Sequence, residues 1–248
     1  IENKFSKNNN IAAFVMESGA QMAGGVIIYP KGFQKKIRQL CKKYDVLFVL
    51  DEIATGFGRL GSMIQYEEQK SIPDISAFGK MLTGGYLTMA ATLTNKKVFD
   101  SFSGEFNDWK HLFHGHTYTG NPIAAAVANE NLKMYQKNNL IKKIQKTSKI
   151  FTKFYQEISE IDIVGDIRHK GMLMGIELVT NKSKKTPIKP KKSINKIFFE
   201  EGKKQGIYLR TLGNIVMLVP PLAISENELN LLLNKTIKTI KSAKSQLI

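Results

Sequence analysis

The residues best suited to chemistry are an acid and a lysine, each placed where an apolar run gives way to a glycine-containing turn. Asp51 follows the apolar run Val46–Leu50, and Lys80 follows Ile75–Phe78 and one glycine. In open parallel sheets, ligands bind outside the carboxyl ends of the strands, so we expect both residues at one binding edge. An acid and an amine placed in this way can hold a flat, anionic aldehyde. We therefore predict pyridoxal phosphate chemistry.

This cofactor requires an amine for a Schiff base, an anion beside its pyridine nitrogen, donors for its phosphate and packing against its ring. Lys80 is the predicted amine. Because an unperturbed lysine has a pKa of about 10.4, a partly desolvated site is needed to make it reactive. Asp51 is predicted to keep the pyridine nitrogen protonated, and Ile53 to pack against the ring face.

The polar, glycine-containing stretch from Phe113 to Pro122 is the predicted phosphate site. It runs into an alanine-rich helix, and the N–H groups at a helix N-terminus attract phosphate. Thr117 is the predicted side-chain donor. His114 and His116 could suggest zinc, but no third ligand lies within reach in the sequence, so we interpret both as hydrogen-bonding groups of the loop and predict no metal.

Two further patterns concern ligands. Arg210 is predicted to end a short strand, and its rigid guanidinium would suit a substrate carboxylate. The pair Asp51-Glu52 after an apolar strand is also typical of the metal-binding acid of nucleotide hydrolases. That alternative expects the phosphate loop G-x-x-x-x-G-K-[ST], which this sequence lacks.

Composition limits the other classes of function. No apolar run approaches the roughly 18 residues of a membrane span, and the N-terminus shows no signal-peptide pattern. The single cysteine, Cys41, excludes an internal disulfide framework and fits a reducing cytoplasm; we expect it to be buried on a helix. The formal charge of +16 could indicate nucleic acid, but the lysines are spread out, and the Lys182–Lys192 loop has no aromatic residues for base stacking. We expect neither nucleic acid nor a membrane as partner.

The order of elements indicates an α/β fold followed by an α+β module. The chain starts at Ile1 rather than Met, so we expect it to be the later part of a longer protein. Residues 1–138 are predicted to be the C-terminal part of a large cofactor-binding domain, and 139–248 a small α+β domain. The expected strands are 11–16, 46–50, 75–78, 89–93, 171–179, 207–210 and 215–219, with a turn and strand around 164–168; the expected helices are 30–44, 122–135, one long basic helix over about 141–158, 194–204 and 226–241.

At this point the motifs are recognisable as those of a family. D-E-I-A-T-G-F-G-R, F-G-K-x-L-T-G-G, H-G-H-T-Y-T-G-N-P and L-R-T-L-G…V-P-P resemble class III aminotransferases of pyridoxal fold type I. The Thr83-Gly84-Gly85 turn, the histidine loop and V-G-D-I-R resemble more narrowly the biotin-pathway members. These aminate 8-amino-7-oxononanoate to 7,8-diaminononanoate. The similarity covers nearly the whole chain, from Glu17 and Gln21 onward.

The resemblance implies a role for each matched residue. Lys80 would bind the cofactor covalently and later move the substrate proton, while Asp51 pairs with the pyridine nitrogen. His116 and Thr117 would approach the phosphate from the neighbouring subunit of a homodimer with shared active sites.

The resemblance also implies a substrate contact and a reaction. Gly115 and Arg210 would contact the keto acid, Arg210 through its carboxylate. The implied reaction is ping-pong, with S-adenosylmethionine as the usual amino donor and lysine as the alternative. It would take place in the cytoplasm.

Two departures from the family pattern leave alternatives open. His116 stands where many members carry proline, which suggests a subgroup. The family's N-terminal third, with its glycine-serine phosphate loop and a ring-stacking aromatic, is missing, so we expect this polypeptide alone to bind cofactor poorly. The alternatives are another class III ω-aminotransferase, acting on ornithine or 4-aminobutyrate, and an inactive truncated fragment. The histidine loop and Arg210 argue against the first, and the intact pair of Asp51 and Lys80 against the second.

Overall fold

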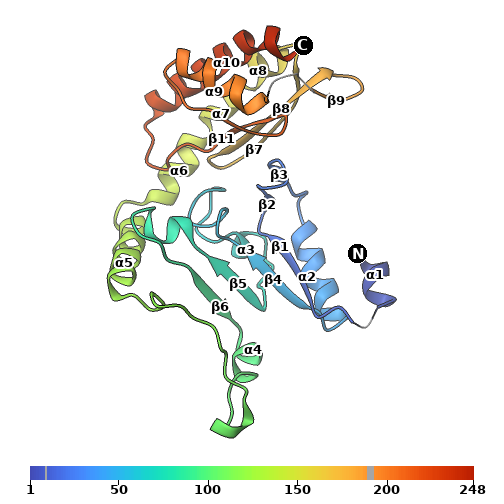
Figure 1. The fold of residues 1–248 in the computed structure, drawn as a ribbon, viewed down its shortest axis with the longest axis vertical. Coiled ribbons are helices and arrows are strands. Elements are labelled where there is room, and N and C mark those ends of the chain that lie inside the picture. Colours follow the sequence, from blue (N-terminus) through green and yellow to red (C-terminus); the bar gives the residue numbers. More distant parts are fainter. Residues whose placement is uncertain (9, 189–192) are drawn as a thin grey trace. The chain divides into compact units, whose positions relative to one another are not determined.

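The chain divides into two compact units in the computed structural model, which describes residues 1–8, 10–188 and 193–248 (Figure 1). Unit 1 comprises Ile1–Ala20, Tyr29–Phe57 and Ser62–Leu140, and unit 2 comprises Gln21–Ile28, Gly58–Gly61 and Ile141–Ile248. Two short stretches of unit 2 therefore precede the boundary expected near residue 138.

Unit 1 is built on a four-stranded sheet in the order β1-β4-β5-β6. Its strands are β1 (Ala13–Glu17), β4 (Leu47–Asp51), β5 (Ile75–Phe78) and β6 (Ala91–Thr94). The first three run parallel, and β6 is antiparallel to β5. Phe48 and Leu50 of β4 are fully buried, as a continuously apolar strand inside a parallel sheet should be. The expectation of a mostly parallel sheet with flanking helices is confirmed.

Helix α2 (Phe33–Lys43) of unit 1 packs on this sheet. Ile37 and Cys41 of α2 share a core cluster with Phe48 and Leu50. Burial raises the pKa of the Cys41 thiol to about 11, so the expectation of a buried structural cysteine is confirmed. The other helices are α1 (Glu2–Ser6), α3 (Gln65–Glu68), the short 3₁₀ turn η1 (Lys80–Thr83), α4 (Lys96–Asp100), η2 (Phe106–Asp108) and α5 (Pro122–Lys137).

Between β6 and α5 the chain forms an aromatic arm, residues 99–118, which Figure 1 shows running through η2 and back to α5. Its large side chains are exposed: Phe106 by 83%, Trp109 by 73% and Phe113 by 75%. The rings of Trp109 and Phe113 are nearly parallel, with centroids 6.5 Å apart. Contiguous apolar exposure of this kind usually marks an interaction surface.

Unit 2 contains an antiparallel sheet in the order β10-β11-β8-β7, with β9 paired to β8. Leu229, Leu233, Ile237 and Ile240 are buried along its C-terminal helix α10 (Glu226–Leu247). The remaining bounds are β2 (Ala20–Gln21), β3 (Ile27–Ile28), α6 (Leu140–Ser148), α7 (Ile150–Lys153), α8 (Tyr155–Glu160), β7 (Val164–Lys170), β8 (Leu173–Asn181), β9 (Thr186–Pro187), α9 (Ile194–Lys204), β10 (Arg210–Leu212) and β11 (Ile215–Leu218). None of the helices in the described ranges is both long and apolar enough to cross a membrane.

Several sequence-based expectations for unit 2 were wrong in detail. The long basic helix is broken into α6, α7 and α8, with tighter turns at Lys149 and Phe154, whose N–H groups bond three residues back. Residues 164–170 form one full strand. The lysine-rich loop contains β9, and its residues 189–192 lie outside the described residues.

Arg210 begins its strand rather than ending it. β10 pairs with β11 from Arg210 opposite Met217 to Leu212 opposite Ile215, across a turn in which Gly213 has φ of 57°. Ile207 is instead tied to the end of α9, where its N–H donates to the carbonyl of Gly202. The apolar run 207–209 was therefore not a strand, because it packs against a helix end.

A buried arginine holds the short loop Gly58–Gly61 within unit 2. Arg59 is only 7% exposed, and its Nη1 donates to the carbonyl oxygens of Met172 and Pro220, each at 2.8 Å. The N–H of Met172 donates back to the carbonyl of Arg59. Gly171 lies against the same loop: a Cβ there would come within 2.6 Å of the Arg59 carbonyl oxygen.

We predict that Gly171→Ala destabilises unit 2 much more than Gly213→Ala. Both glycines have positive φ, 59° and 57°, but a Cβ at Gly213 would meet nothing within 4 Å. Gly213→Ala should therefore cost only the left-handed penalty, about 1–2 kcal/mol of unfolding free energy. Gly171→Ala should cost about 3 kcal/mol or more in total, because backbone must also move. Urea unfolding followed by circular dichroism measures both, and equal losses would contradict the packing argument.

Candidate functional site

Asp51 and Lys80 lie at the same edge of the unit 1 sheet. Asp51 is the last residue of β4, and it pairs with Ala77 of the adjacent parallel strand β5. Lys80 comes two residues after Phe78, the last residue of β5, with Gly79 between them. It is the first residue of η1. The two residues singled out from the sequence are therefore brought to one place by the pairing of β4 with β5.

The amine of Lys80 is available for chemistry. Lys80 is exposed, its φ is 41°, and its Nζ has no hydrogen bond or ion pair with any described residue. A non-glycine residue with positive φ is uncommon and often marks a functional position. The partly desolvated setting expected for a reactive lysine is not present in this chain, because the residues described here leave the side chain open to solvent.

The carboxylate of Asp51 is half-buried and uses only one of its oxygens. Oδ1 accepts a hydrogen bond from the backbone N–H of Ile53 at 2.8 Å, which fixes the side chain within its own turn. The main-chain oxygen of Asp51 accepts from the N–H of Ser18 at 2.9 Å. Within the described part of the chain, no further hydrogen bond reaches this carboxylate, so Oδ2 can accept an N–H from a ligand.

Gly79 allows Ile53 to lie beside the chain that leads to Lys80. A Cβ at Gly79 would be 3.3 Å from Ile53 Cγ2 and 3.8 Å from the Cβ of Ala90. The glycine before Lys80 is needed for this close approach rather than for its dihedral angles, which are extended. Asp51, Ile53 and Lys80 are therefore neighbours at the strand ends.

Helix α5 braces both parts of this site, which the sequence analysis did not detect. Asn131 Nδ2 donates to the carbonyls of Met81 at 2.7 Å and Leu82 at 3.1 Å, and so holds the turn that starts at Lys80. Tyr135 donates from its hydroxyl to the carbonyl of Phe57 at 2.8 Å, at the end of the Asp51 segment. Periodicity indicated the helix, but only its packing shows what its polar residues hold.

The histidine loop is exposed, and its geometry differs from the expected helix N-terminus. His116 Nδ1 accepts from the N–H of Tyr118 at 3.1 Å, and the N–H of His116 donates to Thr119 Oγ1 at 2.9 Å. Thr117 lies in a turn ahead of α5, and Asn121 Oδ1 already accepts from the first N–H groups of that helix. The first N–H groups of α5 are thus capped by Asn121, and the role of this loop as a phosphate site stays a prediction.

The roles predicted for all of the site residues, including Thr117, Gly115 and Arg210, stay predictions. Thr117 and Gly115 are exposed, and a Cβ at Gly115 would meet only Thr119 Oγ1, at 3.6 Å. Arg210 belongs to unit 2 and is exposed, and its guanidinium makes no ion pair with the residues described.

These residues fit pyridoxal phosphate by the chemistry of their groups. The set comprises an unpaired amine at Lys80, a free carboxylate oxygen at Asp51, an apolar side chain at Ile53 and an exposed hydroxyl at Thr117. These match the amine, the pyridine partner, the ring packing and the phosphate donor that the cofactor requires. No cluster of three or more histidine, cysteine or acidic residues suited to a metal ion occurs in residues 1–8, 10–188 and 193–248.

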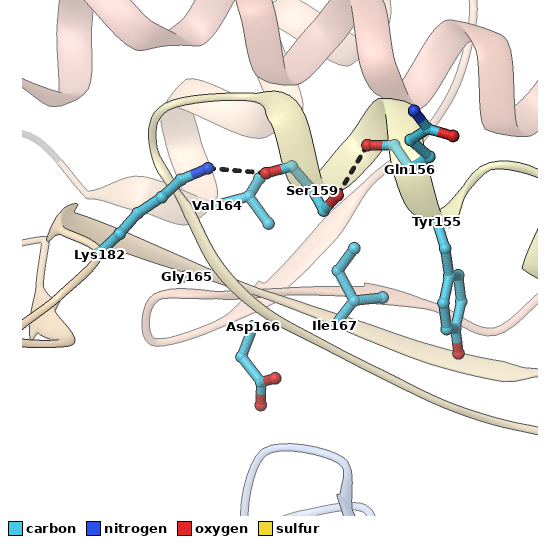
Figure 2. A pocket seen from close by; sticks show the side chains of 8 residues that line it. All are labelled: Tyr155, Gln156, Ser159, Val164, Gly165, Asp166, Ile167 and Lys182. Carbon is cyan, nitrogen blue, oxygen red and sulfur yellow. Dashed lines mark hydrogen bonds between the residues drawn. The ribbon is translucent and has the colours of Figure 1, made fainter.

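A pocket of about 580 Å³ lies elsewhere, in unit 2, between α8 and β7 (Figure 2). Its charged groups are already paired. Lys182 Nζ donates to the carbonyl of Ser159 at 2.7 Å, and Asp166 lies 3.4 Å from the Arg168 guanidinium. None of the residues singled out for chemistry lines it, so it is not the candidate site.

Comparison with known proteins gives matches over nearly the whole chain. The family model for aminotransferase class-III matches residues 2–240. The adenosylmethionine-8-amino-7-oxononanoate aminotransferase of Aquifex aeolicus is 40% identical over 99% of this chain and 54% of its own length. The enzyme of that name from Staphylococcus aureus is 43% identical over 90% of this chain and 49% of its own length.

Solved structures show the same fold. The adenosylmethionine-8-amino-7-oxononanoate aminotransferase of Methanocaldococcus jannaschii superposes with a TM-score of 0.88 at 41% identity, covering 92% of this chain and 53% of that one. The ω-transaminase of Pseudomonas jessenii in complex with PMP has a TM-score of 0.91 at 30% identity, covering 99% and 54%. The chain thus spans about half the length of the curated relatives it matches.

Proposed function

The chain belongs to the class-III aminotransferase family, and we propose that it forms part of a pyridoxal-phosphate-dependent enzyme that transfers an amino group to 8-amino-7-oxononanoate, giving 7,8-diaminononanoate in biotin synthesis. The observation that carries this proposal is the meeting of Asp51 and Lys80 at one sheet edge, in a chain 40% and 43% identical to enzymes named for that substrate. The donor proposed from those names is S-adenosylmethionine, with lysine as the alternative.

Each side chain at the sheet edge has a distinct task in this proposal. When bound, pyridoxal phosphate supplies an electron sink that allows a proton to leave the substrate carbon. Lys80 is proposed to hold the cofactor through its free amine and afterwards to carry that proton on Nζ. The free oxygen of Asp51 would accept the pyridine N–H, and Ile53 would exclude water from one ring face.

The remaining residues would bind the phosphate and the substrate. His116 and Thr117 are proposed to donate to the phosphate, and Gly115 and Arg210 to contact the keto acid. An arginine binds a carboxylate through two parallel N–H···O bonds, which fixes orientation as well as charge. Arg210 is suited to this because no acid among the described residues engages it.

We also propose that the enzyme is a cytoplasmic homodimer. The exposed rings of the aromatic arm support the dimer, because in a lone chain the apolar surface of Phe106, Trp109 and Phe113 would stay in contact with water. The arm, residues 99–118, includes His116 and Thr117, so a partner that covers the whole arm would also cover both residues. The single, buried Cys41 is compatible with a reducing compartment.

Two alternatives are less well supported. A 4-aminobutyrate or ornithine enzyme of the same family is one; the γ-aminobutyrate transaminase 3 of tomato is 36% identical over 95% of this chain, less than the relatives above. An inactive fragment is the other. The free amine of Lys80 and the free oxygen of Asp51 favour a working site.

We predict that Lys80 is the residue that binds pyridoxal phosphate covalently. Incubation with the cofactor and reduction with borohydride should leave a pyridoxyl group on the peptide containing residue 80, detected by mass spectrometry. Lys80→Ala should abolish this adduct. The matched control is Lys70→Ala, because Lys70 is also exposed with positive φ, 50°, in unit 1.

Labelling spread equally over many lysines, or unchanged in Lys80→Ala, would refute the assignment. The experiment is run in parallel on a polypeptide extended upstream of Ile1. An adduct only in the extended form would mean that this chain lacks part of the cofactor site.

We predict that the acceptor is 8-amino-7-oxononanoate and that Arg210 binds its carboxylate. Loss of a charge-assisted contact worth about 1.5–3 kcal/mol should raise the acceptor KM about 10- to 100-fold in Arg210→Ala, with a smaller change in kcat. Turnover is measured with S-adenosylmethionine and with lysine as donor, and with the acceptors of the alternative enzymes. Lys203→Ala, an exposed cation of α9, is the control. A preference for another acceptor would reject this substrate.

We predict that the aromatic arm is buried when the chain dimerises. Trp109 is the single tryptophan and is 73% exposed, so its emission should shift to the red as the protein is diluted. Phe113→Ser should weaken association in sedimentation velocity, while Tyr208→Ser, which changes a ring 71% exposed in unit 2, should not. A chain that stays monomeric at all concentrations, or equal effects of both variants, would rule out this interface.

A further inference from the structure

Glu52 is a fully buried acid directly after Asp51, and none of the roles above uses it. Its Oε2 accepts from the N–H of Gln65 at 2.9 Å and its Oε1 from the N–H of Tyr66 at 2.7 Å. These are the first two residues of α3, whose N–H groups have no partner within the helix. Both oxygens of this buried carboxylate are therefore held by the backbone of α3, which agrees with setting aside the metal-binding acid in the sequence analysis.

A buried polar network extends from Glu52 to the neighbouring elements. The Ser18 hydroxyl hydrogen bonds to the Glu52 carboxylate. Gln34 of α2 donates to Ser18 Oγ at 3.0 Å and to Ser71 Oγ at 2.8 Å, and its Oε1 accepts from the N–H of Gly19 at 2.7 Å. Ser18, Gln34 and Ser71 are all at most 1% exposed. The network joins the end of β1, helix α2 and the segment ahead of β5.

The backbone around Glu52 connects this network to the candidate site. The N–H of Glu52 donates to the carbonyl of Ala77 in β5, and its carbonyl accepts from the N–H of Gly56 at 3.0 Å. A Cβ at Gly56 would lie 3.0 Å from the Glu52 carbonyl oxygen and 3.2 Å from Oε2. The loop after Asp51 is therefore folded tightly onto Glu52.

Burial of this acid is costly, which argues that it is more than a space-filling residue. Burial raises the pKa of Glu52 above its ordinary value, while the bonds from Gln65, Tyr66 and Ser18 act in the opposite direction. A raised pKa in the folded state favours folding at low pH, and this contribution is lost as the pH rises through the folded-state pKa.

We propose that Glu52 is a positioning residue for the reaction: it holds the segment Asp51–Phe57 so that Asp51 and Ile53 face the cofactor. This inference rests on the proposed function. Asp51 and Glu52 are consecutive residues at the end of a strand, so their side chains point to opposite sides. Fixing Glu52 against α3 and Ser18 consequently fixes the direction of Asp51.

The test compares Glu52→Gln with Glu201→Gln. Glu201 is a second buried acid, 5% exposed, that accepts from Lys204 and Gln246 in unit 2. Glutamine keeps the volume but offers only one acceptor oxygen to the two N–H groups of α3. Three properties are measured: amide hydrogen exchange by mass spectrometry, the Kd for pyridoxal phosphate, and the pH midpoint of the bound cofactor's absorbance band.

In Glu52→Gln we expect exchange at residues 53–57 and 65–66 to be about 10-fold faster, since local opening becomes easier. The Kd for pyridoxal phosphate should rise about 10-fold, as expected for one lost charge-assisted bond. The absorbance midpoint should shift, because Asp51 no longer faces the pyridine nitrogen; a purely structural residue would leave it unchanged. Glu201→Gln should alter none of the three.

Unchanged exchange, affinity and absorbance midpoint in Glu52→Gln would overturn the proposal, as would equal changes in Glu201→Gln. If even the unaltered chain binds no pyridoxal phosphate, the proposed function fails for this chain, and the exchange comparison alone decides whether Glu52 holds the segment. Should Glu52→Gln not fold, Ser18→Ala removes one bond to Glu52 and the acceptor of one Gln34 N–H, and should produce smaller changes in the same direction. Their absence would count against the proposal.

Discussion

The parallel pairing of β4 with β5 is the constraint on which the rest of unit 1 depends. With Asp51 opposite Ala77, the acid and the turn that carries Lys80 leave the sheet at the same edge. A shift of one residue would turn Asp51 to the other face and exchange it with Glu52, because side chains alternate along a strand. Asn131 and Tyr135 of α5 secure the two segments beyond that edge, one at the Lys80 turn and the other at Phe57. The site is thus held from the strands on one side and from a single helix on the other.

The interior behind this edge is polar where an apolar core would be simpler to stabilise. Glu52, Ser18, Gln34 and Ser71 form a connected set in which the buried side chains have partners. Such networks are sensitive to loss of any member, because the group left behind is buried without a partner. Their directional bonds specify one arrangement of β1, α2, α3 and the loop after β4, which is what a site with defined angles between its groups requires.

The division into two units shows that sequence order and spatial order differ in this chain. Gly58–Gly61 directly follows the Asp51 segment, yet Arg59 binds the carbonyls of Met172 and Pro220 and so joins this loop to unit 2. Gly171 can approach the loop only because it has no Cβ. The motif that carries Asp51 therefore ends in a structural anchor, and one continuous stretch of sequence contributes to both units. The aromatic arm and Lys80 are both exposed in this chain, which spans about half of its relatives' length.

Local sequence predicted most of the strands and helices, because these depend on periodicity and glycine positions, and residue chemistry suggested the reactive groups. Val46–Leu50 was recognisable as a buried strand without any coordinates, and Lys80 and Asp51 were predicted as a cofactor pair. The breaks at Lys149 and Phe154, the start of β10 at Arg210 and the capping of α5 by Asn121 involve hydrogen bonds between residues close in sequence, but the periodicity of apolar residues does not reveal them. The contacts of Asn131, Arg59 and Glu52 were decided by tertiary packing. Nothing in their local sequence distinguishes them from surface polar residues, and their partners lie up to 161 positions away.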